Sequence, residues 1–165
     1  MKNSNSKLFF CLFLLMLNFI CCSDKKNIKI YYSNENKNLY YTIEKKNDTI
    51  ISIFNHRTKQ KIHIDTTIYT KKINGYYDNY EDPFYGSSRK LGLSTIKDTL
   101  YNYKVALANF YCKISKIDNQ HFKTVYANYD SLVYKFRNSI YYDKNYNIYK
   151  IENIINKEKY VYIPR

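Results

Sequence analysis

The chain has 165 residues, a length typical of one domain, and its 27 Lys and Arg outnumber its 14 Asp and Glu, for a net charge of +13. Only four of the basic residues are arginines and the lysines are spread along the chain, which is not the pattern of a nucleic-acid site. The sequence also lacks a phosphate-binding glycine loop, Gly-x-Ser-x-Gly, Cys-x-x-Cys and His-Glu-x-x-His. We therefore expect neither nucleic-acid binding nor a cofactor, and no class of enzyme is indicated.

The first 26 residues have the parts of a secretory signal. A short region with two lysines is followed by an apolar run from Leu8 to Ile20, which is broken only by Asn18. This run is shorter than the about 20 apolar residues that a membrane-spanning helix needs. Residues 1–21 are therefore predicted to be a cleaved signal peptide.

The end of this segment, Phe19-Ile20-Cys21-Cys22, resembles the lipobox of bacterial lipoproteins. In that family an apolar residue and a small residue precede the cysteine that receives the lipid. The resemblance implies that Cys22 carries acyl chains such as palmitate, with Cys21 as the alternative acceptor. It further implies a protein anchored to a membrane of the cell envelope, and Ser23 and Asp24 are compatible with delivery to the outer membrane. Two or more acyl chains hold a protein on a bilayer durably.

Removal of the signal leaves 144 residues with a net charge of +11, because 25 Lys and Arg remain against 14 Asp and Glu. Residues 22–27 are predicted to be a tether. Once Cys22 is lipidated, Cys112 is the one remaining cysteine, so no disulfide is expected within the mature chain. Nothing in the sequence around Cys112 suggests catalysis, and we interpret it as a buried packing residue.

Residues 28–165 are predicted to form a single β-rich domain. Short stretches in which apolar and polar residues alternate predict half-buried strands, because successive side chains on a strand point to opposite faces. In the first part of the domain these stretches are 28–32, 39–44, 49–54 and 61–70. The polar break at 45–48 predicts a hairpin between the second and third of them.

The stretch 61–70 alternates most regularly of the four. One face, which we predict to pack on the core, carries the isoleucines Ile62, Ile64 and Ile68. The other face, which we predict to be solvated, carries Lys61, His63 and Asp65.

Residues 71–97 contain all three glycines and one of the two prolines, and are predicted to be a long irregular loop between two meanders. Strands are predicted again in the second meander, at 110–117, 121–128, 132–137, 139–142, 148–152 and 159–163. Residues 95–117 are ambiguous: apolar residues recur there at helical spacing, but they also alternate, and we favour strand. The expected fold is an all-β antiparallel sandwich or barrel built from two meanders, or α+β if a helix covers 95–117.

The histidines and Asp65 are the candidates in this sequence for metal binding or catalysis. His63 and Asp65 lie two apart on a predicted strand, so both could contact one metal ion, and His56 is near enough in sequence to be a third ligand. The spacing matches no established zinc pattern, and no metal site is assigned. A small envelope hydrolase, metal-dependent or not, that uses His63, Asp65 or His121 is the alternative that these residues leave open.

An aromatic stretch at 75–86 lies within the predicted loop. It combines acidic residues with five aromatic ones, Tyr76, Tyr77, Tyr80, Phe84 and Tyr85. Exposed tyrosines give a large contact area at low entropic cost, so this loop is a candidate site for a protein or glycan partner. In the alternative interpretation the loop folds back and its rings cover one end of the core.

These observations favour a non-catalytic binding or interaction protein of the cell envelope. An immunity or inhibitor protein, whose partner is a toxin or an enzyme, is a second alternative beside the hydrolase.

Overall fold

The computed structural model describes residues 27–59, 61–79, 81–82, 86–87, 90–96, 98–105, 108–128 and 135–164. The predicted signal peptide, Cys21 and Cys22 lie outside the described residues, as do Tyr80, Phe84 and Tyr85 of the aromatic loop.

The strands, in chain order, are β1 (Asn27–Ser33), β2 (Leu39–Lys46), β3 (Thr49–Arg57), β4 (Ile62–Lys72), β5 (Gly75–Asp78), β6 (Glu81–Asp82), β7 (Gly86–Ser87), β8 (Lys90–Leu93), β9 (Thr99–Val105), β10 (Ala108–Lys116), β11 (His121–Asn128), β12 (Phe136–Asp143), β13 (Ile148–Ile155) and β14 (Glu158–Pro164). Twelve of them form one antiparallel sheet in the order β8-β5-β4-β3-β2-β1-β14-β13-β12-β11-β10-β9, and β6 pairs with β7 separately. No helix occurs among the described residues, which confirms the all-β prediction.

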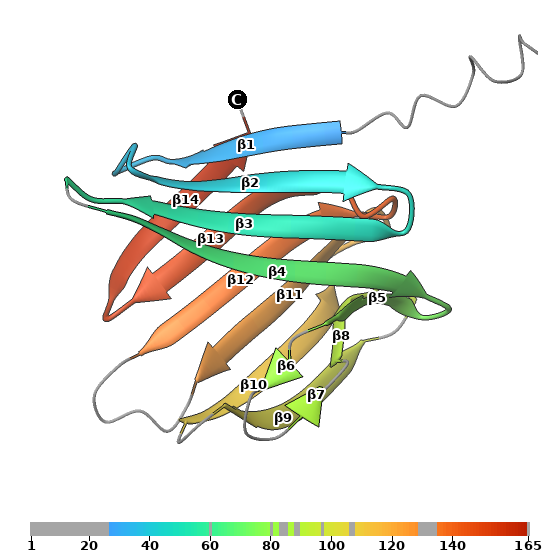
Figure 1. The fold of residues 1–165 in the computed structure, drawn as a ribbon. Helices are drawn as coiled ribbons and strands as arrows, with labels where there is room; N and C mark the ends of the chain where they lie inside the picture. Colours follow the sequence, from blue (N-terminus) through green and yellow to red (C-terminus); the bar gives the residue numbers. More distant parts are fainter. Residues whose placement is uncertain are drawn as a thin grey trace, which may run out of the picture.

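The sheet consists of two meanders joined along one seam. One runs from β1 through β5 to β8 and the other from β9 to β14, and the first strand pairs with the last, with Tyr32 opposite Ile163. Figure 1 shows that the sheet curls into a half-barrel, so that β2–β5 lie across from β11–β13. Asn47 has a positive φ of 47° in the tight turn between β2 and β3, which confirms the hairpin predicted there.

Two local predictions need correction. The helix considered for 95–117 is wrong, because β9 and β10 form a regular antiparallel pair there. The loop predicted for 71–97 is only partly irregular, because β5 and β8 within it both join the main sheet. The loop was predicted from the glycines of this region, but Gly75 and Gly92 lie within strands rather than in a loop.

The edge strand β8 closes the curl through side chains of the opposite meander. Tyr101 Oη donates a hydrogen bond to Leu91 O at 2.8 Å, and Thr124 Oγ1 donates to Gly92 O at 2.7 Å. Beyond the end of β8, Tyr142 Oη accepts from Ser94 N at 3.0 Å and donates to Ser94 O at 2.9 Å. Backbone groups of an edge strand must find partners when they are buried, and hydroxyl groups supply them here.

Tyrosine dominates the core on the concave face. Its most deeply buried large side chains are Tyr31, Tyr76, Tyr142, Tyr162, Ile50, Leu93, Ile114 and Ile151. The rings meet edge to face or stacked, as where Tyr41 packs on Tyr162 with ring centroids 4.9 Å apart. A core of this composition brings hydroxyl groups inside, and these must be paired.

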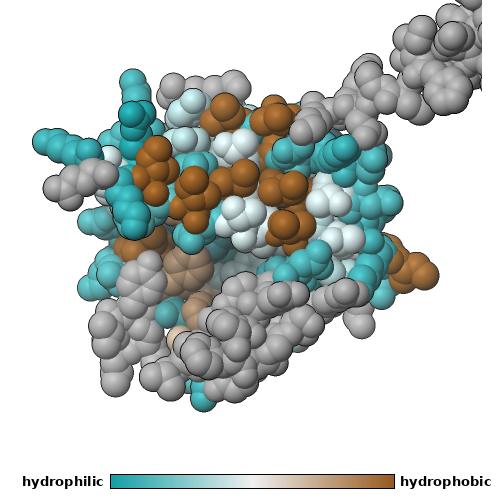
Figure 2. Space-filling view, viewed as in Figure 1, coloured by the Kyte–Doolittle hydropathy of each residue, from teal (hydrophilic) through white to brown (hydrophobic). Residues whose placement is uncertain are grey.

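The prediction that the isoleucines of β4 pack on the core is wrong, whereas Lys61, His63 and Asp65 are exposed, as predicted. Ile62, Ile64 and Ile68 are 52%, 60% and 42% exposed on the convex side, whereas Asp65 lines the concave side. Alternation establishes which residues share a face, but it does not say which face is inside. Figure 2 shows the apolar side chains of the convex face gathered over β1–β4, where the isoleucines of β4 join Ile28 and Ile30.

This orientation can be tested with two matched substitutions that keep a β-branched side chain. Ile64→Thr on the convex face should change the free energy of unfolding by less than about 0.5 kcal/mol. Ile151→Thr, at a side chain only 1% exposed, should lower it by about 2 kcal/mol or more, because it removes buried apolar contacts and buries a hydroxyl. Urea unfolding of both variants measures the difference, and equal losses would mean that the two faces are wrongly assigned.

Candidate ligand-binding cavity

A cavity of about 360 Å³ lies on the concave side of the sheet, between the two meanders. Its aromatic lining residues are Tyr41, Phe54, Tyr69, Tyr103, Tyr126 and Phe136. Its polar ones are Ser52, Asp65, Thr67, Asp78, Asn138 and Asn153, and Ile140, Ile148, Ile151 and Ile155 complete it. Rings with a few polar groups are the usual lining of a small-molecule site.

The pairing of the strands explains why these side chains meet. Residues directly opposite in an antiparallel sheet project from the same face. On one wall Tyr41, Phe54 and Asp65 follow one another across β2, β3 and β4. On the other wall Tyr126 lies opposite Asn138, which lies opposite Asn153, across β11, β12 and β13. Each wall is thus a row of cross-strand neighbours, and the curl turns the two rows toward each other.

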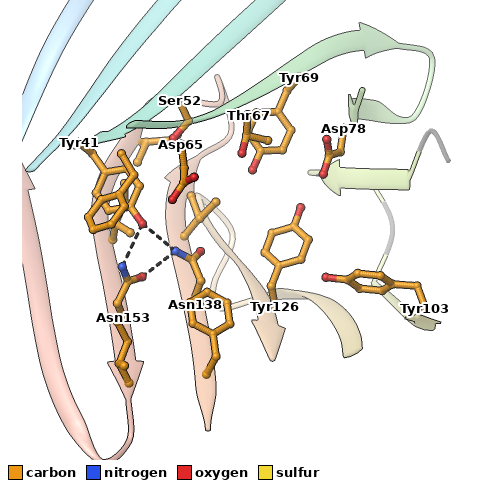
Figure 3. Close-up of a pocket in the computed structure, with 16 residues that line it drawn as sticks. Tyr41, Ser52, Asp65, Thr67, Tyr69, Asp78, Tyr103, Tyr126, Asn138 and Asn153 are labelled. Carbon is orange, nitrogen blue, oxygen red and sulfur yellow. Dashed lines mark hydrogen bonds between the residues drawn. The ribbon is translucent and has the colours of Figure 1, made fainter. Parts of the chain in front are cut away.

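Three side chains form a hydrogen-bonded triangle that links the walls. Tyr41 Oη accepts hydrogen bonds from Asn153 Nδ2 at 3.0 Å and from Asn138 Nδ2 at 3.2 Å, and Asn138 Nδ2 also donates to Asn153 Oδ1 at 2.7 Å (Figure 3). Burial raises the pKa of Tyr41 to about 12 even though both amide hydrogen bonds act to lower it, so the phenol stays neutral. The triangle fixes the orientation of both amides.

Two oxygen-bearing groups face the cavity beside this triangle. The Asp65 carboxylate points from β4 toward Asn138, and it makes no hydrogen bond or ion pair within the part of the chain that is described (Figure 3). The Asn138 amide nitrogen is used in the triangle, which leaves Oδ1 as its available acceptor. A ligand at this point would meet acceptors of hydrogen bonds.

Tyr126 stands in the middle of the cavity with an unpaired hydroxyl. Its Oη is buried and has no hydrogen-bond partner among the described residues, and burial raises its pKa well above the ordinary value. A Cβ atom at Gly92 would lie 2.8 Å from this oxygen and 2.6 Å from Cε1 of Tyr69, so only glycine lets β8 approach so closely. Because this oxygen is fully enclosed beside Tyr69 and Cys112, it is not accessible to a ligand in the cavity.

The charge of the cavity differs from that of the whole domain. The described lining residues include two carboxylates, Asp65 and Asp78, and no Lys, Arg or His, although the mature chain carries +11. The end near Asp78 has a cation close by, because Lys90 lies opposite Asp78 across β5 and β8 and places Nζ 3.9 Å from the Tyr103 ring centroid. The Asp65 end has no such neighbour among the lining residues.

The histidines considered as metal ligands lie apart from this cavity. His56 and His63 are exposed cross-strand neighbours with ring centroids 6.0 Å apart, and no group of three His, Cys, Asp or Glu that could hold a metal ion is found in the described ranges. His121 is the first residue of β11, with Nδ1 2.9 Å from the Asp118 carboxylate. Only Asp65, of the residues proposed for hydrolysis, lines the cavity.

Part of the aromatic loop can be placed. Tyr76 is 2% exposed and packs edge to face on Tyr146, with ring centroids 4.9 Å apart. Tyr77 is half-buried, and Lys72 Nζ lies 5.2 Å from its ring centroid. Tyr76 is placed as expected if the rings of this loop cover the core. A binding role for the loop stays a prediction, because Tyr80, Phe84 and Tyr85 lie outside the described residues.

Cys112 is fully buried, as predicted for a packing residue. Burial raises the pKa of its thiol to about 11, so the thiolate is scarce near neutral pH.

Comparisons with protein-family models, with curated proteins and with solved structures found no match. The cavity is therefore identified as a candidate site by its geometry alone.

Polar residues on otherwise apolar strand faces are the pattern in the sequence that indicates this cavity. Asn153 falls on the same strand face as Ile151 and Ile155, and Ser52 falls between Ile50 and Phe54 in the same way. A polar residue on the apolar face of a strand either pairs with another buried group or lines a cavity. The partner, and hence the cavity, could not be inferred because it comes from a distant strand.

Two tyrosine-to-phenylalanine changes test the difference between a paired and an unpaired buried hydroxyl. Tyr142→Phe should lower the free energy of unfolding by about 1–3 kcal/mol, because it leaves both Ser94 backbone groups without their partner. Tyr126→Phe should leave it within about 0.5 kcal/mol or raise it, since no hydrogen bond is lost. Thermal and urea unfolding compare the two, and a larger loss in Tyr126→Phe would show that its hydroxyl has a partner.

Proposed function

We propose that this chain is a lipid-anchored, non-catalytic binding protein of the bacterial cell envelope, and that the cavity between its two meanders holds a small ligand. The observation that supports binding is the cavity itself. Its volume of about 360 Å³ falls in the range of ligand sites, about 300–1,000 Å³, and its lining combines rings with a few oriented polar groups.

The rigidity of the lining also supports this proposal. The triangle of Tyr41, Asn138 and Asn153 holds two amides in one orientation, and these residues come from strands rather than from loops. A site whose polar groups are already oriented loses little freedom when a ligand binds. The cavity is therefore better suited to holding a ligand than the aromatic loop, which remains the second candidate surface.

The anchor is proposed from the N-terminal sequence. No helix of a length and apolarity sufficient to cross a membrane occurs in the described residues. The first strand begins at Asn27, five residues after Cys22, so an extended tether reaches about 17 Å at most. A protein lipidated at Cys22 would hold the start of β1 close to the bilayer surface.

A lipid anchor on Cys22 predicts the mass of the mature protein and its release from membranes when this cysteine is replaced. Protein extracted from membranes with detergent should begin at Cys22 and be heavier than residues 22–165 by the mass of the attached lipid. Cys22→Ser should prevent lipidation and release the protein from the membrane fraction. Intact mass spectrometry and fractionation measure both, and a soluble wild-type chain that still begins at Met1 would contradict the proposal.

Ligand binding predicts that filling the cavity removes a bound molecule. Thr67→Trp places a large ring in the cavity, whereas Thr66→Trp places the same ring on the exposed convex face of β4. Protein purified from cell envelopes should release the same small molecule from the wild type and from Thr66→Trp, and none from Thr67→Trp. Mass spectrometry of the denatured samples detects it. Retention of the molecule by Thr67→Trp would place binding elsewhere.

A further inference from the structure

We infer that the ligand of this cavity is a small organic cation whose ammonium group is held at Asp65 and whose apolar body lies against the aromatic lining. This inference rests on the proposed function, because it names the chemical class of the molecule that the cavity would bind.

The first argument is the sign of the charge. The described lining contains two carboxylates and no basic side chain, in a mature chain with 25 Lys and Arg. An anionic ligand at Asp65 would face like charge, and no basic side chain lines that end of the cavity to neutralise it. A cationic ligand would gain a charge-assisted hydrogen bond to a carboxylate, which is about twice as strong as a neutral one.

The second argument is the arrangement of the hydrogen-bonding atoms. The Asp65 carboxylate is an acceptor only, and Asn138 Oδ1 is the acceptor that the triangle leaves available. Figure 3 shows Asp65 and Asn138 directed toward one space from β4 and β12, whereas the Tyr126 hydroxyl points toward Tyr69 and Asp78. An ammonium group has three donors and no acceptor, so it matches this set.

The third argument is the nature of the walls. Phe54 lies beside Asp65 in the cross-strand row, and Phe136 and Tyr103 lie on the opposite wall. Aromatic faces attract cations and bury the apolar part of an organic ion. At the Asp78 end of the cavity the protein itself makes such a contact, because the ammonium of Lys90 sits 3.9 Å from the Tyr103 ring centroid.

That lysine also decides which carboxylate is available. Lys90 lies opposite Asp78 in the sheet and places a cation at that end of the cavity. No ion pair or hydrogen bond of Asp65 is found in the described part of the chain, and its side chain is exposed at the open side of the cavity. A ligand cation is therefore expected at Asp65, near the triangle.

The test uses three probes of similar shape and different charge: 2-phenylethylammonium, 2-phenylethanol and phenylacetate. Titration of the purified mature protein, followed by NMR chemical shifts, should show the ammonium binding about tenfold or more tightly than the alcohol and no binding of phenylacetate. Affinities in the millimolar range are expected for ligands of this size. Added salt should weaken the ammonium complex.

Variants locate the charge that is responsible. Asp65→Asn keeps the shape of the side chain and should weaken ammonium binding about tenfold while leaving the alcohol unaffected. Asp48→Asn removes the same charge from an exposed carboxylate that contacts Lys71 away from the cavity, and should have no effect on binding. Unfolding curves of each variant verify that the fold is retained.

The outcomes separate this inference from the proposed function. If the alcohol or phenylacetate binds as well as the ammonium, or if Asp65→Asn binds it unchanged, the cation assignment is wrong and the cavity remains a binding site. If none of the probes binds and Thr67→Trp retains the co-purified molecule, both the cation assignment and the binding role of the cavity are overturned.

Discussion

The structure depends on the curl that brings two halves of one antiparallel sheet face to face. Two kinds of contact hold it: the backbone pairing of β1 with β14, which joins the meanders, and the hydroxyl-to-backbone bonds that attach β8 to the opposite wall. The first contact joins the first and last strands. The second holds β8 to the opposite meander, with which it forms no strand pair. A flat sheet of these strands would expose its concave tyrosines to water and would have no cavity.

Tyrosine makes this kind of closure workable. Its ring supplies buried apolar area and its hydroxyl supplies a hydrogen bond at a distance from the backbone that carries it. Tyr142 illustrates the combination, because its ring stacks on Phe122 while its hydroxyl satisfies two backbone groups of Ser94. Tyr31 does the same by donating to Ile148 O at 2.6 Å across the seam. Several of the tyrosines are thus structural links between walls, and the abundance of aromatic residues alone is no evidence for a binding surface.

Local patterns predicted most of the strands and the class of the fold, because alternation and turn residues act over a few positions. They failed where the outcome depends on distant parts of the chain. The stretch 61–70 has two faces of clear character, and only the curl of the whole sheet sends its isoleucines outward and Asp65 inward. Asn138 and Asn153 are similar: each is an ordinary polar residue in sequence, and their roles arise from contact with Tyr41, about a hundred positions earlier. The sequence thus predicted elements but not the site that they enclose.

The convex face divides along the same seam as the meanders. Over β12–β14 it is charged. Glu152 forms ion pairs with Lys150 at 3.2 Å and Lys159 at 3.3 Å, and it accepts a hydrogen bond from Tyr141 at 2.7 Å. Burial of Glu152 acts to raise its pKa, but these partners outweigh it and the pKa is lowered. Over β1–β4 the face is apolar. Much of the basic charge is therefore matched locally or spread over an open surface.

This distribution bears on how an acidic cavity can select a cation inside a basic protein. Exposed charges are screened over about 8 Å at physiological ionic strength, so the net charge of the domain acts weakly on a ligand that has reached the cavity. Within the cavity the nearest groups decide, and these are a carboxylate, an amide oxygen and aromatic rings. The same net charge gives an approaching cation no electrostatic attraction at long range. Selectivity in such a protein must come from contacts made after entry, which is why the orientation of Asn138 by the Tyr41 triangle matters as much as the charge of Asp65.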